Sequence, residues 1–193
     1  MNKLWALLLL LIVQVEAHGQ TVTTLQNLTL QSTMNAPKGV VVSCGVRFAG
    51  LTSVPGSSDD IEVVDGSIAV FLDGFTGVKG ALKLGKLSEP AGQLRTSGKT
   101  IAWVRIGDGE PLAPLDGATA PGDGAGYFIF RAPTDPGFSA IQGFMEAKNL
   151  WIGFQGGTGQ DRIFSGQGQM SAQTRSELAA CFGELSSAPQ KTK

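Results

Sequence analysis

The sequence predicts a mainly β fold, a β-rich α+β domain in which a twisted antiparallel sandwich or half-barrel carries one or two short helices. Three observations favour it. Val40–Phe48 alternates apolar and polar residues with the period of two that is typical of a half-buried strand. Glycine makes up 27 of the 193 residues, far more than usual, and lies largely in turns between short apolar segments. Two segments in the C-terminal third have the apolar period of amphipathic helices.

The chain opens with a segment typical of a secretory signal peptide. Residues 1–3 include one lysine, residues 4–13 are an unbroken apolar run, and a short polar stretch ends in Ala17. A run of that length spans about 15 Å as a helix, half of a bilayer core, so a permanent anchor is the weaker interpretation. We expect cleavage after Ala17, with cleavage after Gly19 as the alternative. The mature protein is then expected in the periplasm, or alternatively secreted, with no membrane span.

Residues 18–185 are predicted to form one domain whose strands follow in order. Strands are expected at Thr21–Leu30, Val40–Phe48, Ile61–Leu72, Val78–Leu84, Thr100–Ile106, Tyr127–Arg131, Leu150–Gln155 and Asp161–Ser165. Asp65-Gly66 favours a tight hairpin turn within the third of these segments. The glycines of 156–159 favour a hairpin between the last two. Gly107–Gly126, rich in glycine, proline and aspartate, is expected to be a long loop.

Two helices are expected near the C-terminus. Asp135 is predicted to cap the first, with Pro136 at its first helical position and Asn149 ending it. Ser171 or Thr174 is predicted to cap the second. The apolar faces would be Phe138, Ile141, Phe144 and Met145 in the first helix, and Leu178, Cys181, Phe182 and Leu185 in the second. Residues 186–193 are expected to form a disordered polar tail.

The chain has two cysteines, Cys44 and Cys181. Cys44 lies on the inward face of a predicted strand and Cys181 on the apolar face of the last predicted helix. Both point toward one core if that helix packs on the sheet. Two cysteines in an oxidising compartment usually pair, so a Cys44–Cys181 disulfide is predicted, with two separate buried thiols as the alternative. No Cys-x-x-Cys motif indicates a redox-catalytic pair.

Composition and motifs exclude several classes of function. The formal net charge of −1 gives no basic excess for binding nucleic acid or an anionic membrane. His18 is the one histidine of the chain, so a catalytic imidazole inside the fold is excluded. A mature chain opening with His18-Gly19 resembles the copper-brace proteins, such as lytic polysaccharide monooxygenases, a resemblance that implies a second histidine ligand which this chain lacks. No cofactor, metal site or complete catalytic motif is predicted.

The candidate binding residues are two tryptophans and a group of loop acids. Trp151 shares a strand face with a glycine, and a tryptophan so placed on an outer face could stack on a ligand or partner; a helix covering that face is the alternative. Trp103 is a second candidate. Asp108, Asp116 and Asp123 lie in the Gly107–Gly126 loop, where solvated acids are the usual case and a Ca²⁺ site is the alternative.

These observations predict a non-enzymatic binding module that is exported to the cell envelope and recognises a protein or an envelope ligand. Two alternatives remain open at this point. The first is a hydrolase of envelope glycans or peptides that uses a carboxylate pair. The second is an inhibitor or immunity protein that acts on a partner enzyme through the Gly107–Gly126 loop. The sequence leaves the ligand and the oligomeric state undetermined.

Overall fold

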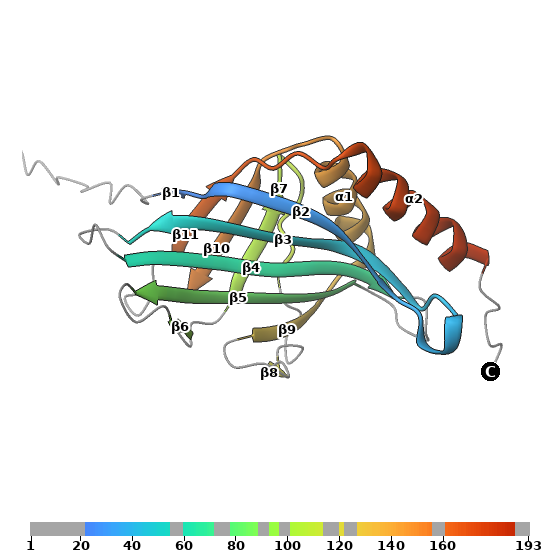
Figure 1. The fold of residues 1–193 in the computed structure, drawn as a ribbon, viewed down its shortest axis with the longest axis horizontal. Coiled ribbons are helices and arrows are strands. Elements are labelled where there is room, and N and C mark those ends of the chain that lie inside the picture. Colours follow the sequence, from blue (N-terminus) through green and yellow to red (C-terminus); the bar gives the residue numbers. More distant parts are fainter. Residues whose placement is uncertain are drawn as a thin grey trace, which may run out of the picture.

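Two β-sheets packed against each other, with two helices at one end, make up the fold (Figure 1). The structure, a computed structural model, describes residues 22–54, 60–71, 78–88, 93–96, 101–113, 120–121, 127–155 and 161–187. The larger sheet comprises β2 (Gln26–Asn35), β3 (Ser43–Ser53), β4 (Asp60–Phe71), β5 (Val78–Ser88), β6 (Gln93–Thr96), β8 (Ala120–Pro121) and β9 (Tyr127–Ala132). The smaller comprises β1 (Val22–Thr24), β7 (Ile101–Ile106), β10 (Leu150–Gln155) and β11 (Asp161–Gly166). The remaining elements are the short 3₁₀ turn η1 (Pro37–Gly39), α1 (Thr134–Met145) and α2 (Ala172–Ser187).

The strand order confirms the predicted β-rich α+β fold. The larger sheet runs β2-β3-β4-β5-β9-β8, with β6 beside β5, and all its pairings are antiparallel. The smaller sheet runs β1-β11-β10-β7, and β1 pairs with β11 in parallel. In Figure 1 the smaller sheet crosses behind the larger one. The predicted leader lies outside the described residues, and none of the helices described is long and apolar enough to span a bilayer.

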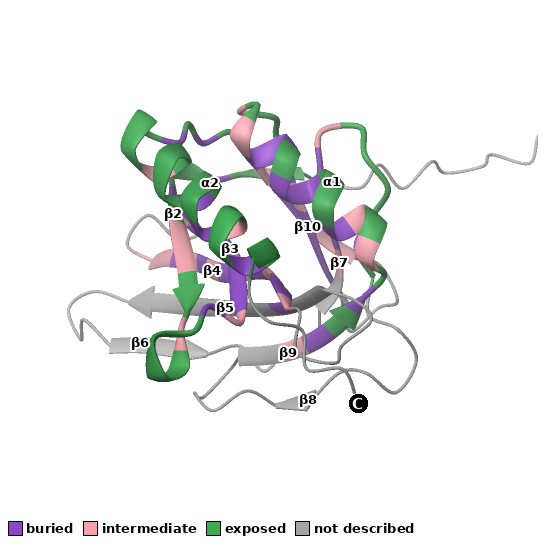
Figure 2. Ribbon diagram, turned by 90° about the vertical axis from the view of Figure 1, so that its right-hand side faces the viewer, coloured by how far each residue is buried: buried purple, intermediate pink, exposed green. Residues whose placement is uncertain are grey.

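The interior lies between the two sheets. Phe48 and Ile68 of the larger sheet and Ile152 and Phe164 of the smaller one are at most 1% exposed. The ring of Phe144 from α1 lies 5.8 Å from that of Phe48 and closes the space beside them. Each such side chain contributes about 1.5–3 kcal/mol by leaving water. Figure 2 shows that both helices turn buried faces inward and exposed faces outward.

The strand predicted at Val40–Phe48 begins later and ends later than expected. Cys44, Val46 and Phe48 point inward as predicted, but β3 pairs with β2 only from Ser43 onward, and Val41, expected to face outward, is buried. Lys38 and Gly39 have φ angles of 57° and 78°, so the chain is still turning there. Val40 is consequently 47% exposed. The apolar pattern alone did not show that the turn extends this far.

The hairpin predicted at Asp65-Gly66 is wrong, because β4 runs unbroken through both residues. Asp65 lies opposite Ala49 of β3, and Gly66 lies opposite Phe48. The Asp65 carboxylate accepts hydrogen bonds of 3.1 and 3.0 Å from the Arg47 guanidinium on the same sheet face. A turn at this point would break the pairing with both neighbouring strands. The continuous ladder therefore outweighs the local preference of the dipeptide for a turn.

The first helix is present, but its predicted cap and face need correction. Asp135 lies in the first turn of α1 and not at its N-cap, which is Pro133. The carboxylate there still favours the helix through the partial positive charge of the N-terminus. Phe138 is 45% exposed and lies 6.1 Å, between ring centroids, from Phe182 of α2. Gly143 lies on the buried face instead, where a Cβ would come within 2.5 Å of Ile106. The helix ends at Met145, before Asn149.

The last helix and its disulfide form as predicted. The backbone N–H of Thr174 donates a hydrogen bond of 3.0 Å to Ser171 Oγ, so Ser171 caps α2 and Thr174 lies inside it. Cys181 is bonded to Cys44 across 137 residues of sequence, with the two Cα atoms 5.8 Å apart. Leu178 and Leu185 are buried beside it. Residues 186 and 187 belong to the helix, and the rest of the predicted tail lies outside the described residues.

Candidate functional site

The outer face of the four-stranded sheet carries the two candidate tryptophans. Val104 and Ile106 of β7, and the alternate residues of β10, point inward and are at most 4% exposed. Trp103, Arg105, Trp151 and Gly153 therefore face outward, because side chains alternate along a strand. Asp161, Ile163 and Ser165 of β11 lie on the same face by register, and Ile163, opposite Gly153, is buried. We call these seven residues the tryptophan face: Trp103, Arg105, Trp151, Gly153, Asp161, Ile163 and Ser165.

The absence of a side chain at Gly153 fixes the position of Trp103. The two residues lie opposite each other on β10 and β7. A Cβ on Gly153 would come within 2.4 Å of the indole Nε1, so the ring lies directly over the glycine. That nitrogen donates a hydrogen bond of 2.7 Å to Asp161 Oδ2 on β11. The indole thus crosses one strand and is held at its far end, with its opposite face directed away from the sheet.

The Arg105 guanidinium lies between the two tryptophans. Its central carbon is 5.2 Å from the ring centroid of Trp151 and 5.9 Å from that of Trp103. Contacts of this kind contribute about 0.5–1 kcal/mol each at partly exposed sites. Its Nε is buried and, within the described ranges, has no hydrogen-bond partner. No described carboxylate pairs with this arginine.

Trp151 lies beside this cation on the outward face of the sheet. It is half-buried, opposite Arg105 on one neighbouring strand and Ser165 on the other. The helices lie elsewhere, since α1 packs against β3, β4 and β7 and α2 against β2 and β3. The helix-covered alternative weighed for Trp151 is therefore not what the described residues form. The binding role of Trp151 and Trp103 stays a prediction.

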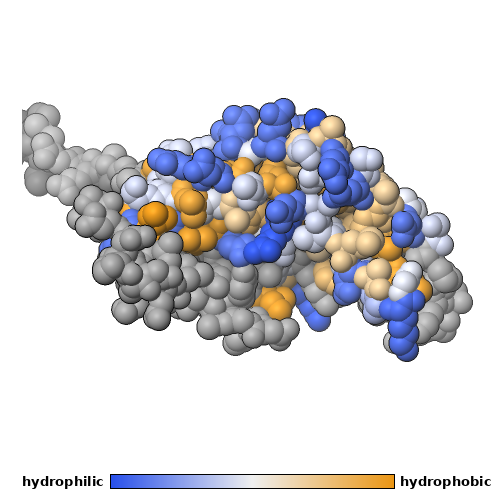
Figure 3. All heavy atoms as spheres, viewed as in Figure 1, coloured by the Kyte–Doolittle hydropathy of each residue, from blue (hydrophilic) through white to orange (hydrophobic). Residues whose placement is uncertain are grey.

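The outer face of the larger sheet offers a contrast. Seen from that side, hydrophobic patches are scattered among hydrophilic residues (Figure 3). Arg47 at its centre is paired with Asp65, and Leu51 is 37% exposed. An arginine already held by a carboxylate is a weaker site for an anion than Arg105, because the ligand would have to displace its partner.

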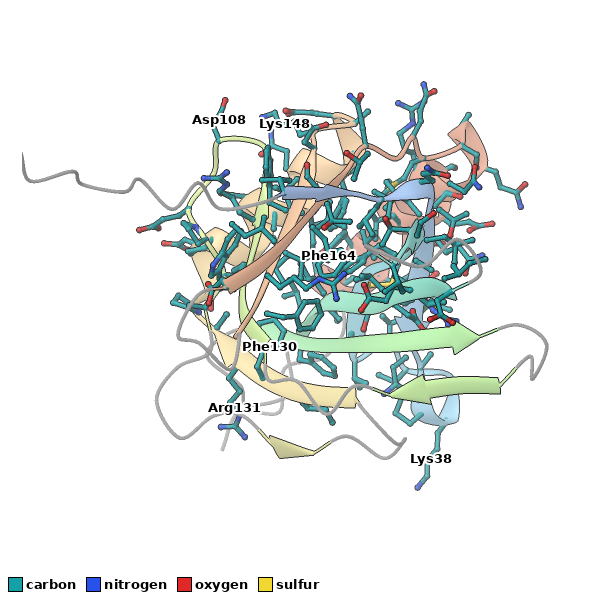
Figure 4. The ribbon with its side chains drawn as sticks, turned by 90° about the vertical axis from the view of Figure 1, so that its left-hand side faces the viewer. Lys38, Asp108, Phe130, Arg131, Lys148 and Phe164 are labelled. Atoms are coloured by element: carbon teal, nitrogen blue, oxygen red, sulfur yellow. A yellow bond between two sulfur atoms is a disulfide. The ribbon has the colours of Figure 1, made fainter. Side chains whose placement is uncertain are left out.

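The loop acids do not gather into a site among the described residues. Asp108 is exposed and points away from the body of the molecule, at the same edge as Lys148 (Figure 4). Asp116 and Asp123 lie outside the described residues. In the part of the chain that the structure describes, no group of three histidine, cysteine or acidic residues could hold a metal ion.

A buried ion pair links the two sheets. Glu62 of β4 is 5% exposed, and its carboxylate accepts a hydrogen bond of 2.6 Å from Arg162 Nη1 on β11. The other oxygen contacts Arg162 Nη2. The guanidinium carbon also lies 4.9 Å from the ring centroid of Phe164, which Figure 4 shows between the sheets. Glu62 is thus engaged in a structural contact between the sheets.

Hydrogen bonds lower the pKa of two surface carboxyls elsewhere. The Ser32 hydroxyl, 2.7 Å from the carboxylate, and then the Gln173 amide lower the pKa of Glu177 on α2. Lys148 and then Gln142 lower the pKa of Glu146, just after α1. Both shifts stabilise the ionised form, whereas a general acid needs its proton held. Neither carboxyl belongs to the tryptophan face.

Sequence reasoning missed Arg105 and Asp161. The alternation that turned Trp103 outward also turns Arg105 outward two residues later, so that signal was present. The Trp103–Asp161 contact depends on strand register and on the gap at Gly153, which the sequence does not give. Comparison with protein-family models, with curated proteins and with solved structures finds no match for the chain.

Proposed function

We propose that this protein is an exported binding module of the cell envelope and that it binds its ligand through the tryptophan face. The observation that carries the proposal is the half-buried Trp151 beside Arg105, whose guanidinium has no carboxylate partner among the described residues. Tryptophan and arginine are the residue types most enriched where binding energy concentrates. Their placement on rigid strands keeps the surface preorganised, which reduces the entropy lost on binding.

Export is supported by two further features. The N-terminal segment has the pattern of a signal peptide. The Cys44–Cys181 disulfide is typical of oxidising compartments, such as the periplasm or the outside of the cell. The hydrolase alternative gains no support from Glu62, whose buried carboxylate is held by Arg162. The inhibitor alternative depends on the Gly107–Gly126 loop, of which residues 114–119 and 122–126 lie outside the described residues.

Cosedimentation with isolated envelopes of the producing cell tests the proposal. The mature, oxidised protein is expected to sediment with the envelope fraction. Trp151→Ala is expected to lower the bound fraction several-fold, and more than tenfold if Trp151 is a hot spot worth about 2 kcal/mol. Phe138→Ala is the matched control, since it removes an aromatic ring that is 45% exposed on α1. Equal sedimentation of both variants, or no sedimentation of the parent protein, would contradict the proposal.

A further inference from the structure

We infer that the tryptophan face recognises an acidic glycan, with a sugar ring stacked on tryptophan and its carboxylate bound by Arg105. This inference rests on the proposed function, because it names the ligand class of the same face. It requires a cation without a carboxylate partner among the described residues, aromatic rings beside that cation, and polar groups next to them. The described residues supply all three on adjacent strands.

The cation is Arg105. No described carboxylate forms an ion pair with it, and because its Nε is buried, the two terminal nitrogens are the atoms with which it would bind an anion. By contrast Arg47 is paired with Asp65 and Arg162 with Glu62. Guanidinium groups bind carboxylates through two parallel hydrogen bonds, and flanking rings strengthen such contacts by excluding water. The ring centroids 5.2 and 5.9 Å away orient the Arg105 guanidinium for one anionic group.

The aromatic surface is the indole of Trp103, over which the Arg105 guanidinium also lies. Its inward side is packed on Gly153, and the hydrogen bond to Asp161 prevents the ring from rotating. An indole held in this way can present the part of its π-face that Arg105 does not cover to a flat ligand. Such a surface suits a sugar ring, whose C–H groups pack on the aromatic face while its hydroxyls stay in water. An extended peptide would more often add to a sheet edge than lie across its face.

Polar groups continue the surface across the sheet. Ser165 of β11 lies opposite Trp151, and Thr24 of β1 lies opposite Ser165. Arg105, Trp151, Ser165 and Thr24 therefore form one row across the four strands. The two hydroxyls can donate to or accept from sugar hydroxyls. The row thus places carboxylate recognition at one end and hydroxyl recognition at the other.

Calorimetric titration with three matched probes tests the ligand class. The probes are an oligomer of galacturonic acid, its methyl ester and a neutral glucose oligomer of equal length. The acid is expected to bind the mature, oxidised protein at least about tenfold more tightly than the ester, since a charge-assisted hydrogen bond is lost in the ester. Arg105→Gln should remove that preference. Arg175→Gln, which removes an exposed positive charge on α2, should preserve it.

The outcomes separate this inference from the proposed function. Equal binding of acid and ester, still abolished by Trp151→Ala, overturns the acidic ligand and leaves the binding face in place. Binding of a peptide with a free terminal carboxylate, but of none of the glycans, overturns the glycan. An acid preference that survives Arg105→Gln overturns the role of Arg105. Envelope binding that Trp151→Ala does not reduce overturns the proposed function itself.

Discussion

Removal of the disulfide gives a quantitative test of how α2 is held to the sheet. Replacing Cys44 and Cys181 by alanine frees a loop of 137 residues in the unfolded chain. The chain-entropy relation gives about 5 kcal/mol for a loop of that length, and measured contributions are typically about 2–4 kcal/mol. We therefore expect the free energy of unfolding to fall by about 3 kcal/mol. For a domain of this size, that corresponds to a decrease in Tm of roughly 6–12 °C.

Urea unfolding followed by circular dichroism measures this loss, with the reduced parent protein as control because it keeps both sulfur atoms. Hydrogen exchange shows where the loss occurs. Apart from Cys181, the buried residues of α2 are Leu178 and Leu185, so few apolar contacts hold this helix to the sheet. The amides of α2 should therefore lose protection first, while those of β3 and β4 keep theirs. Unchanged unfolding together with unchanged exchange in α2 would refute this reasoning.

Two further predictions concern local contacts. Gly153→Ala places a Cβ about 2.4 Å from the Trp103 indole nitrogen, so we expect loss of about 1–3 kcal/mol in stability and an altered near-ultraviolet dichroism spectrum. In Gly183→Ala the new Cβ meets nothing within 4 Å, so this variant of α2 should be more stable than the parent protein by about 0.5–1 kcal/mol. Urea unfolding in which Gly153→Ala is the more stable variant and Gly183→Ala the less stable one would contradict the assigned packing. Ser32→Ala should raise the pKa of Glu177 toward 4.5, as read by NMR titration. Because the pKa of Glu177 is lower in the folded state, the stability that this hydrogen bond contributes is present above the unfolded-state pKa and is lost as the pH falls through the folded-state pKa. A Glu177 pKa that Ser32→Ala leaves unchanged would argue against this hydrogen bond.

Much of the fold could be predicted because it follows from short-range periodicity. Alternation in β3 correctly turned Cys44 inward, and the helical stripe of α2 correctly turned Cys181 toward it. The errors arose where long-range pairing overrides local preference. Asp65 favours a turn in isolation, but its carboxylate is held by Arg47 on the adjacent strand. Phe138 fits an apolar stripe, but it meets Phe182 near the surface.

The candidate face could be predicted in part for the same reason. Alternation along Leu150–Gln155 placed Trp151 on the face opposite to its apolar neighbours, whereas Trp103 was named without a face. Alternation could not show which residues on separate strands become neighbours, because that depends on register. The contact between Trp103 and Asp161 joins residues 58 positions apart in the chain. The contact also requires β11 to join the sheet between β1, which is parallel to it, and β10, which is antiparallel to it.

Residue-by-residue mapping of ligand binding tests the central claim most directly. Envelope fragments made soluble by glycan digestion would be titrated into the isotopically labelled mature protein, and amide and indole NMR signals followed. Binding through the tryptophan face predicts shifts at Trp103, Arg105 and Trp151, including both indole N–H signals. Shifts confined to the opposite sheet, around Arg47 and Asp65, would contradict the claim.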